Sequence, residues 1–288
     1  YLFNGAYKVD YLSNFMKFLI IVSGIFVMLS SSKYLKKNKI FKIEYPILLL
    51  SSILGMFIMI SSNDLMVFYL GLELQSLALY VLASFKRNDQ LSSESGLKYF
   101  VLSALSSGLL LYGCSLIYGF SGSTNFDQIS NNISEVQYGL TLGIVFILVG
   151  LAFKISAVPF HMWAPDVYQG SPTSVTIFFA ILPKIAALSV FIRFLYVPFI
   201  NLIDQWQTII IFVSIASMVF GAVAAIGQKN LKRLMAYSSI SHMGFALAGL
   251  AVGTNEGIQS SLIYISIYLL MNLAFFSCLF MLKRNDIY

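Results

Sequence analysis

The sequence predicts an all-α polytopic membrane protein of about nine transmembrane helices. Of its 288 residues, 58% are hydrophobic and only 10% are charged, whereas soluble domains carry about 25% charged residues. The mean hydropathy is +0.83. No soluble fold of this length could bury so much apolar surface. The apolar residues also fall into runs of about 20, the length that a helix needs to cross the hydrocarbon core.

Nine such runs follow one another in a single transmembrane domain over 1–288, joined by short loops. The longest polar stretch is 121–137. The predicted spans are 11–32, 46–62, 65–84, 97–119, 138–160, 173–198, 207–227, 232–252 and 260–282.

Charged loops and prolines mark these spans in order. The first ends in a run of lysines, and the third is followed by Lys86 and Arg87. The fifth contains Pro159, which predicts a discontinuous helix around 150–165, because proline removes a backbone donor and such breaks survive at membrane depth only against protein or water. The sixth lies between two prolines, and the eighth begins in a basic loop with Lys232. The remaining four are apolar runs between these markers.

The loop charges predict an orientation. The net charge of +6 sits mostly in loops on one side of the membrane, so it indicates topology and not nucleic-acid binding. By the positive-inside rule, the basic side is the cytoplasm or matrix, the N-terminus is outside and the C-terminus is on the matrix side. The basic side collects Lys33, Lys36, Lys37, Lys39, Lys42, Lys86, Arg87, Lys229, Lys232, Arg233, Lys283 and Arg284. The outer side collects Lys8 and the acidic residues Asp10, Asp64, Asp127, Glu135, Asp204 and Glu256.

Glu73, Lys154 and Lys184 are charged residues that lie in otherwise apolar helical segments. A charge at bilayer depth costs several kcal/mol unless it is paired or hydrated, so such residues indicate ion or proton pathways. Lys184 is the deepest, and the adjacent Pro183 favours a hydrated pocket. The alternatives are a protonated, hydrogen-bonded Glu73 and lysines that snorkel to the interface.

The two histidines are His161 and His242. Histidine can pass a proton near neutral pH, and His242 lies well inside its span, although a hydrogen-bonded packing role is the alternative. His161, close to Pro159, is expected to be structural or to lie at a water entrance. Arg193, near the outer end of its span, is expected to snorkel. We find no metal cluster, phosphate loop, dinucleotide motif or nucleophile–base arrangement in the sequence, and we expect no cofactor or metal on this chain.

Three segments carry a resemblance to a known family. They are YLGLELQSLALY from Tyr69 to Tyr80, the block from Phe153 to Arg193 that contains FKISAVPFHMWAPDVYQGSP, and QKNLKRLMAYSSISHMGFALAGL from Gln228 to Leu250. In this order they resemble subunit 2 of the proton-pumping NADH:quinone (ubiquinone) oxidoreductase, respiratory complex I, which is one of its antiporter-like membrane subunits. The resemblance covers most of the chain from about position 45 onward.

The resemblance implies a proton-transfer axis of Glu73, Lys154, Lys184 and His242. Glu73 and Lys154 match the family's ion pair, and Lys184 matches the central lysine of the next helix. When the pair opens, Lys154 passes its proton through water to Lys184. NADH, FMN, iron–sulfur clusters and ubiquinone are expected on other subunits, so the chain has no redox centre. The expected partners are other membrane-arm subunits and lipids, and the expected location is the mitochondrial inner membrane, with a bacterial inner membrane as the alternative.

The same resemblance implies two inverted repeats. Residues 46–198 match the first five-helix repeat, and 207–282 match only part of the second, whereas full-length members have about fourteen helices. Either the sequence is a fragment or a split gene supplies the remaining helices on a second polypeptide; we favour the split. A stand-alone cation/proton antiporter subunit, a non-pumping scaffold of the membrane arm and the related plastid complex are the alternative functions.

Overall fold

The structure is a computed structural model that describes residues 1–37, 40, 42–133 and 138–282. Lys39, Glu135, Lys283 and Arg284, which belong to the predicted charge asymmetry, lie outside the described residues. Within the described ranges the chain forms helices and isolated β-bridges only. The elements are α1 (Tyr11–Lys37), α2 (Glu44–Ser61), α3 (Leu65–Ala83), α4 (Gln90–Ser121), α5 (Phe126–Asn132), α6 (Tyr138–Lys154), α7 (Trp163–Gly170), α8 (Thr173–Tyr196), the 3-10 helix η1 (Ile200–Leu202), α9 (Ile203–Ile226), α10 (Leu231–Ala251) and α11 (Asn255–Leu282).

Eight of these helices are long and apolar enough to cross a membrane, as counted over the described residues. The helix α6 has 17 residues, and α7 continues it after a non-helical segment at 155–162. Together, α6 and α7 take the place of the fifth predicted span. The predicted all-α, polytopic fold with a discontinuous helix is therefore confirmed.

Two features of the elements differ from the prediction. The helix α4 begins at Gln90, one turn or more before the predicted start, because Asp89 accepts a hydrogen bond from the Leu91 backbone N–H and so caps it. The polar stretch before the fifth span also contains the short helix α5, which Asn125 caps in the same way. Counting apolar residues cannot detect turns that polar caps stabilise.

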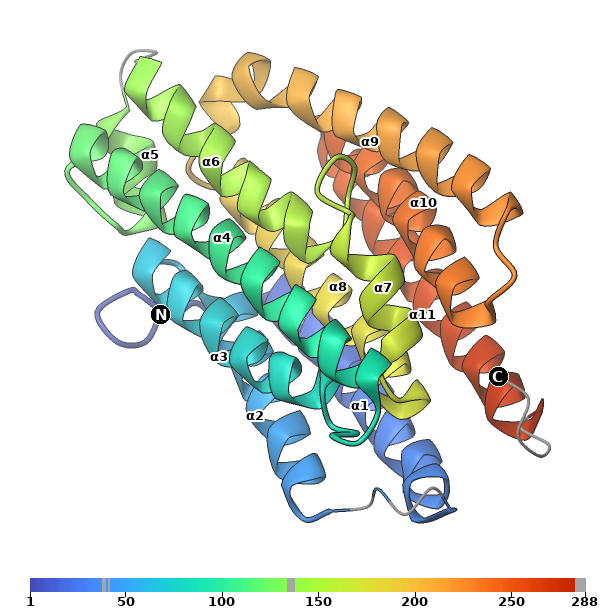
Figure 1. The fold of residues 1–288 in the computed structure, drawn as a ribbon. Helices are drawn as coiled ribbons and strands as arrows, with labels where there is room; N and C mark the ends of the chain where they lie inside the picture. The colour runs from blue at the N-terminus through green and yellow to red at the C-terminus, as the bar shows by residue number, and fades with distance from the viewer. Residues whose placement is uncertain (38–39, 41, 134–137, 283–288) are drawn as a thin grey trace.

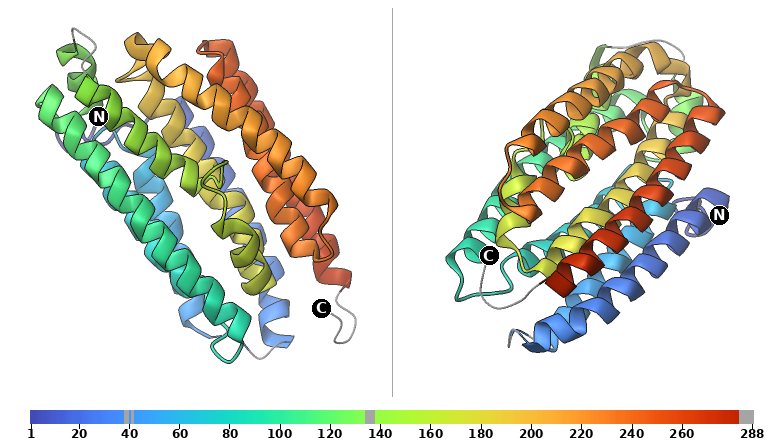
Figure 2. Two further views of the ribbon diagram at one scale, coloured as in Figure 1. Left: turned by 45° about the horizontal axis from the view of Figure 1, so that its top comes forward. Right: turned by 90° about the vertical axis from the view of Figure 1, so that its right-hand side faces the viewer.

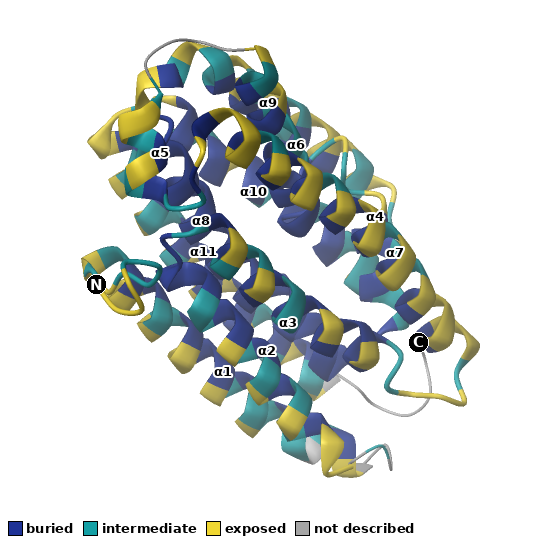
Figure 3. Cartoon of the chain, turned by 90° about the vertical axis from the view of Figure 1, so that its left-hand side faces the viewer, coloured by how far each residue is buried: buried dark blue, intermediate teal, exposed yellow. Residues whose placement is uncertain are grey.

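The helix α8 occupies the centre of an elongated bundle (Figures 1 and 2), in contact with α1, α2, α6, α7, α10 and α11. Every residue from Thr173 to Leu195 is buried. The outer helices, in contrast to α8, are only partly buried, and Figure 3 shows that their exposed residues face away from the bundle. These residues include large apolar side chains such as Leu70, Leu105 and Leu270, as expected for helices that face lipid.

Ion pairs tie the bundle at both ends. At the end with the basic loops, the Asp166 carboxylate on α7 accepts hydrogen bonds from Lys98 on α4 at 2.9 Å and from Arg233 on α10 at 2.8 Å. At the other end, Arg193 on α8 donates to both carboxylate oxygens of Asp10, at 2.9 and 3.0 Å. Arg193 is only 3% exposed, so the expectation that it snorkels is wrong. Its partner lies 183 positions away, a separation at which sequence gives no signal.

Glycines allow α2 and α3 to pack closely. A Cβ atom on Gly71 would lie 2.8 Å from the Met59 backbone nitrogen and 3.0 Å from the Gly55 carbonyl oxygen. Small residues at such crossings let membrane helices approach each other. This contact positions α3, which carries Glu73.

We expect Gly71→Ala to separate α2 from α3, because the added methyl group overpacks a rigid backbone contact. The free energy of unfolding of the detergent-solubilised protein should fall by about 1–3 kcal/mol, and its unfolding temperature should fall with it. Gly108→Ala on α4 is the matched control, since a Cβ atom there meets nothing within 4 Å. Equal unfolding temperatures for the two variants would contradict the close-packing argument.

The Asp10–Arg193 pair predicts a pH dependence of stability. Burial alone would raise the pKa of Asp10, but the Ser13 backbone N–H and the Arg193 guanidinium outweigh it, so the pKa of this carboxyl lies below its usual value. A carboxyl whose pKa is lowered by folding stabilises the fold above its unfolded pKa of about 4, and this contribution is lost as the pH falls through the folded pKa.

Asp10→Asn is therefore expected to lower the free energy of unfolding by about 1–3 kcal/mol at neutral pH. This difference in stability from wild type should shrink below about pH 4. Unfolding temperatures measured between pH 3 and pH 7 would check this. Asp204→Asn, at an exposed position, should leave the stability close to that of wild type throughout. A penalty for Asp10→Asn that persists unchanged at low pH would show that the carboxylate charge is not its source.

Candidate functional site

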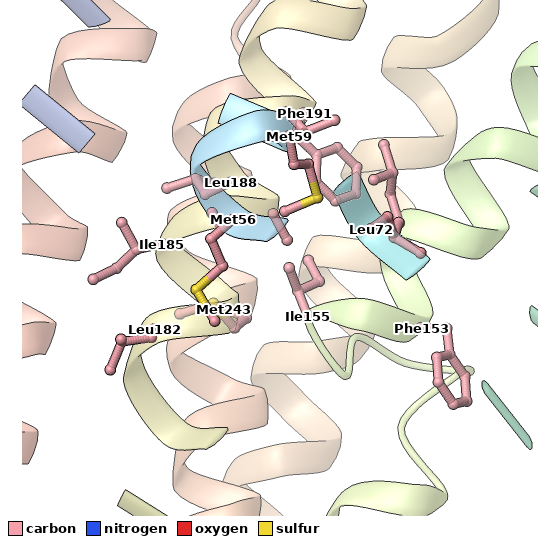
Figure 4. Close-up of a cluster of buried hydrophobic side chains, with 14 of the residues drawn as sticks. Met56, Met59, Leu72, Phe153, Ile155, Leu182, Ile185, Leu188, Phe191 and Met243 are labelled. Carbon is pink, nitrogen blue, oxygen red and sulfur yellow. The ribbon is translucent and has the colours of Figure 1, made fainter. Parts of the chain in front are cut away.

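Lys154 is the last residue of α6, where the helix breaks. Backbone N–H groups in the break still form hydrogen bonds. The Ala157 N–H donates to the Ala152 carbonyl at 2.8 Å, and the Val158 N–H donates to the Ser217 hydroxyl of α9 at 2.9 Å. Figure 4 shows Ile155 from this segment among the buried side chains of α2, α8 and α10. The predicted discontinuity thus places the end of α6, with its lysine, inside the protein.

The Lys154 ammonium is held by hydroxyl groups. It is 5% exposed and donates to Ser76 Oγ on α3 at 2.8 Å and to Ser103 Oγ on α4 at 2.7 Å. The Tyr80 hydroxyl also donates to Ser103 Oγ, at 2.7 Å. We refer to Ser76, Ser103 and Tyr80 as the hydroxyl cradle. The helix α4 contacts both α3 and α6, which explains why these side chains meet.

Glu73 lies on α3, one turn before Ser76, and is partly buried. Glu73 is close enough to Lys154 to act on it electrostatically. Among the described residues, however, the two side chains do not form an ion pair with nitrogen and oxygen within 4.0 Å of each other. The buried Glu73 Oε1 atom has no hydrogen-bond partner. The two groups are therefore neighbours that are not in contact in this structure, and their pairing stays a prediction.

Lys184 lies in the middle of α8 and is 1% exposed. Its Nζ atom donates to Ser239 Oγ on α10 at 2.6 Å and lies 5.8 Å from the centre of the Tyr168 ring. Pro183 cannot donate to the helix ladder. One turn before Lys184, the Ala180 carbonyl also accepts a hydrogen bond from the Tyr268 hydroxyl of α11, at 2.9 Å. Neighbouring helices thus supply polar groups around this lysine, and snorkelling is excluded by its burial.

His242 lies on α10, near enough to Lys184 for the lysine's charge to act on it. Its Nδ1 atom is 2.7 Å from the Tyr264 hydroxyl, and its ring centre is 5.3 Å from that of Tyr268. His161 lies elsewhere, in the segment between α6 and α7, with its ring 4.4 Å from that of Phe220. The structure thus brings His242, but not His161, to the central lysine.

Aromatic rings connect the surroundings of the two lysines. The Tyr99 ring is 5.0 Å from the Tyr80 ring of the hydroxyl cradle and stacks on Trp163 at 4.6 Å. Trp163 in turn lies 6.4 Å from Tyr168, which faces Lys184. Tyr99 is 2% exposed. A chain of aromatic contacts therefore runs from the hydroxyl cradle to the ring that faces Lys184.

The sequence did not reveal the partners of the lysines. Ser103 lies outside the three segments that carry the resemblance, and Tyr80, Tyr168 and Ser239 lie inside them without being singled out. Serines are common in these helices, where many donate to a backbone carbonyl one turn earlier, as Ser107 does. The described residues contain no group of three or more His, Cys, Asp or Glu side chains that could hold a metal ion.

Comparisons with known proteins relate this arrangement to a family. Residues 62–287 match the family described as NADH:quinone oxidoreductase/Mrp antiporter, TM. NADH-quinone oxidoreductase subunit N from Pelagibacter ubique (strain HTCC1062) is 77% identical over 287 residues, which cover 100% of this chain and 61% of that protein. Subunit N from Parvibaculum lavamentivorans is 53% identical over 288 residues, which cover 99% of this chain and 60% of that protein.

Solved structures show the same fold. The chain matches respiratory complex I from Thermus thermophilus with a TM-score of 0.82 and 33% identity, over 97% of this chain and 59% of the other. It matches the Mrp complex from Dietzia sp. DQ12-45-1b with a TM-score of 0.81, over 91% and 49% of the two chains, although at 23% identity this likeness shows the fold alone.

The chain spans about 60% of the length of the two subunit N proteins compared above. These relatives, which are bacterial, confirm the resemblance to a complex I membrane subunit. Because the match at 62–287 takes in well over half of its residues, the chain belongs to the NADH:quinone oxidoreductase/Mrp antiporter transmembrane family.

Proposed function

We propose that this chain is an antiporter-like subunit of the membrane arm of NADH:quinone oxidoreductase and carries part of a proton path through the membrane. The observation that carries the proposal is that Lys154 and Lys184 are both buried and that their ammonium groups donate hydrogen bonds to the neutral hydroxyls of Ser76, Ser103 and Ser239. Breaking or omitting a counter-charge for a buried cation costs several kcal/mol. Two such lysines are therefore poor structural elements but suitable sites for taking up and releasing a proton.

In this proposal Glu73 holds Lys154 in its charged form when the two approach, because an opposite charge nearby favours the ammonium. When Lys154 moves away from Glu73, its burial favours the neutral amine, and the released proton moves toward Lys184. His242, next to Lys184, would receive or return a proton at the following step. The driving energy comes from electron transfer on other subunits.

The two ends of the bundle support the predicted orientation. The described basic residues Lys42, Lys86, Arg87 and Lys232 lie at the end where Asp166 is bonded, and the Asp10–Arg193 pair lies at the opposite end. With bacterial relatives, we propose the inner membrane of a bacterium, with the basic end in the cytoplasm and the N-terminus outside. The division into repeats at 46–198 and 207–282, and a second polypeptide that completes the subunit, stay predictions.

A stand-alone cation/proton antiporter is the second candidate function, supported by the family that includes the Mrp antiporter and by the shared fold with the Mrp complex. The 77% identity to a protein named as a subunit of NADH-quinone oxidoreductase favours the first candidate. Purification of the chain together with NADH-oxidising activity would separate the two.

Lys184→Met should reduce NADH-driven proton pumping by the assembled complex in sealed vesicles to about a tenth of the wild-type rate or less, a loss that corresponds to about 1.4 kcal/mol. Methionine fills a similar volume but cannot carry a proton. Lys229→Met, at an exposed position of the basic loop, is the control and should pump normally. Normal pumping by an assembled Lys184→Met complex would place Lys184 outside the path and favour the scaffold alternative.

The same variant is expected to keep or raise the unfolding temperature of the subunit, since replacing a buried charge by an apolar side chain of similar size removes its desolvation cost. Ser239 keeps a hydrogen bond to the Ala236 carbonyl. Thermal unfolding of the purified complex would measure this. A large drop in stability would mean that Lys184 holds the bundle together.

A further inference from the structure

The hydroxyl cradle around Lys154 has a property that Glu73 lacks. An ammonium group can only donate hydrogen bonds, and a carboxylate can only accept them, whereas a serine or tyrosine hydroxyl can do either. The preferred partner of Glu73 is therefore a charged Lys154. The hydroxyl cradle can bind Lys154 in either its charged or its neutral form, because a hydroxyl hydrogen can rotate so that the group donates or accepts.

Ser103 Oγ is 2.7 Å from both Lys154 Nζ and the Tyr80 hydroxyl. When Lys154 is charged, Ser103 accepts one hydrogen bond from the ammonium and one from Tyr80. When Lys154 is neutral, Ser103 can turn its own hydrogen toward the nitrogen lone pair, while Tyr80 still donates to the serine oxygen. The three heavy atoms need not move between these two states.

Ser76 complements this arrangement. Its hydroxyl donates to the Leu72 carbonyl at 2.7 Å, so its oxygen is left to accept an N–H from Lys154 at 2.8 Å. A neutral amine retains two N–H groups, so this bond survives the loss of a proton. Ser76 thus fixes the position of the nitrogen atom, and Ser103 adapts to its charge.

We propose that Ser76 and Ser103, with Tyr80 behind Ser103, form a second station for the Lys154 side chain, at which the amine is held equally well with or without its proton. Lys154 then alternates between Glu73, where it stays charged, and the hydroxyl cradle, where it can release its proton. The serines are positioning residues. This inference rests on the proposed proton path and specifies how one member of that path is regulated.

Threonine and valine provide the sharpest test, because they have nearly the same shape and differ by the hydroxyl group. The double variants Ser76→Thr/Ser103→Thr and Ser76→Val/Ser103→Val would be compared in the assembled complex, for NADH-driven pumping in sealed vesicles and for unfolding temperature. We expect the threonine pair to pump at about the wild-type rate and the valine pair to pump about five- to tenfold more slowly, as expected from the loss of two hydrogen bonds.

Ser106→Ala is the matched control on α4, since Ser106 is buried and its hydroxyl has no hydrogen-bond partner; it should pump normally. If both double variants fail to assemble, Ser103→Ala and Tyr80→Phe replace them, and each is expected to slow pumping relative to Ser106→Ala. Equal pumping by the threonine and valine pairs, or by Ser103→Ala and Ser106→Ala, would overturn the cradle proposal.

Lys154→Met, measured in parallel, separates this proposal from the proton path itself. If Lys154→Met pumps normally, the proposed path through Lys154 fails, and the cradle with it. If Lys154→Met loses pumping while the valine pair matches the threonine pair, the path stands and only the cradle is wrong. Loss in both Lys154→Met and the valine pair supports both.

Discussion

The cost of placing two lysine side chains in an apolar interior is the constraint on which the rest of this structure depends. Neither Lys154 nor Lys184 reaches the surface, and each must find hydrogen-bond acceptors on other helices. The break after α6 turns the end of that helix toward α3 and α4, and the close packing of α3 on α2 brings Ser76 into reach. The fold can therefore be understood as a set of helices arranged to supply hydroxyl groups at two depths.

The charged members of the site could be found from sequence because a charge within an apolar run is conspicuous. Glu73, Lys154 and Lys184 could be predicted for this reason, and the break could be predicted because Pro159 lies within an apolar run. Their partners could not be found, because Lys154 bonds to serines 78 and 51 positions away and local patterns contain no information on such contacts. The short helix α5 was not predicted, because its apolar face is limited to Phe126 and Ile129 and a search for long apolar runs does not detect it.

The aromatic rings between the lysines impose a second constraint. Tyr99, Trp163 and Tyr168 present mainly apolar faces, and such a region excludes water unless the rings move apart. In the proposed path, a proton that passes from one lysine to the other therefore requires this region to become hydrated. Control of hydration, together with the position of the Lys154 amine, would keep the two halves of the path from being open at once.

The burial of α8 on all sides also has a mechanical consequence. A helix enclosed by six neighbours and pinned at its outer end by Arg193 to Asp10 cannot slide along its axis like a piston without unpacking the bundle. The helix α8 is therefore expected to stay in place while side chains around it change their orientation. In the proposed path, coupling along this subunit would therefore involve reorientation of side chains, movement of water and flexing of the interrupted helix, whose non-helical segment at 155–162 opens the helical hydrogen-bond ladder.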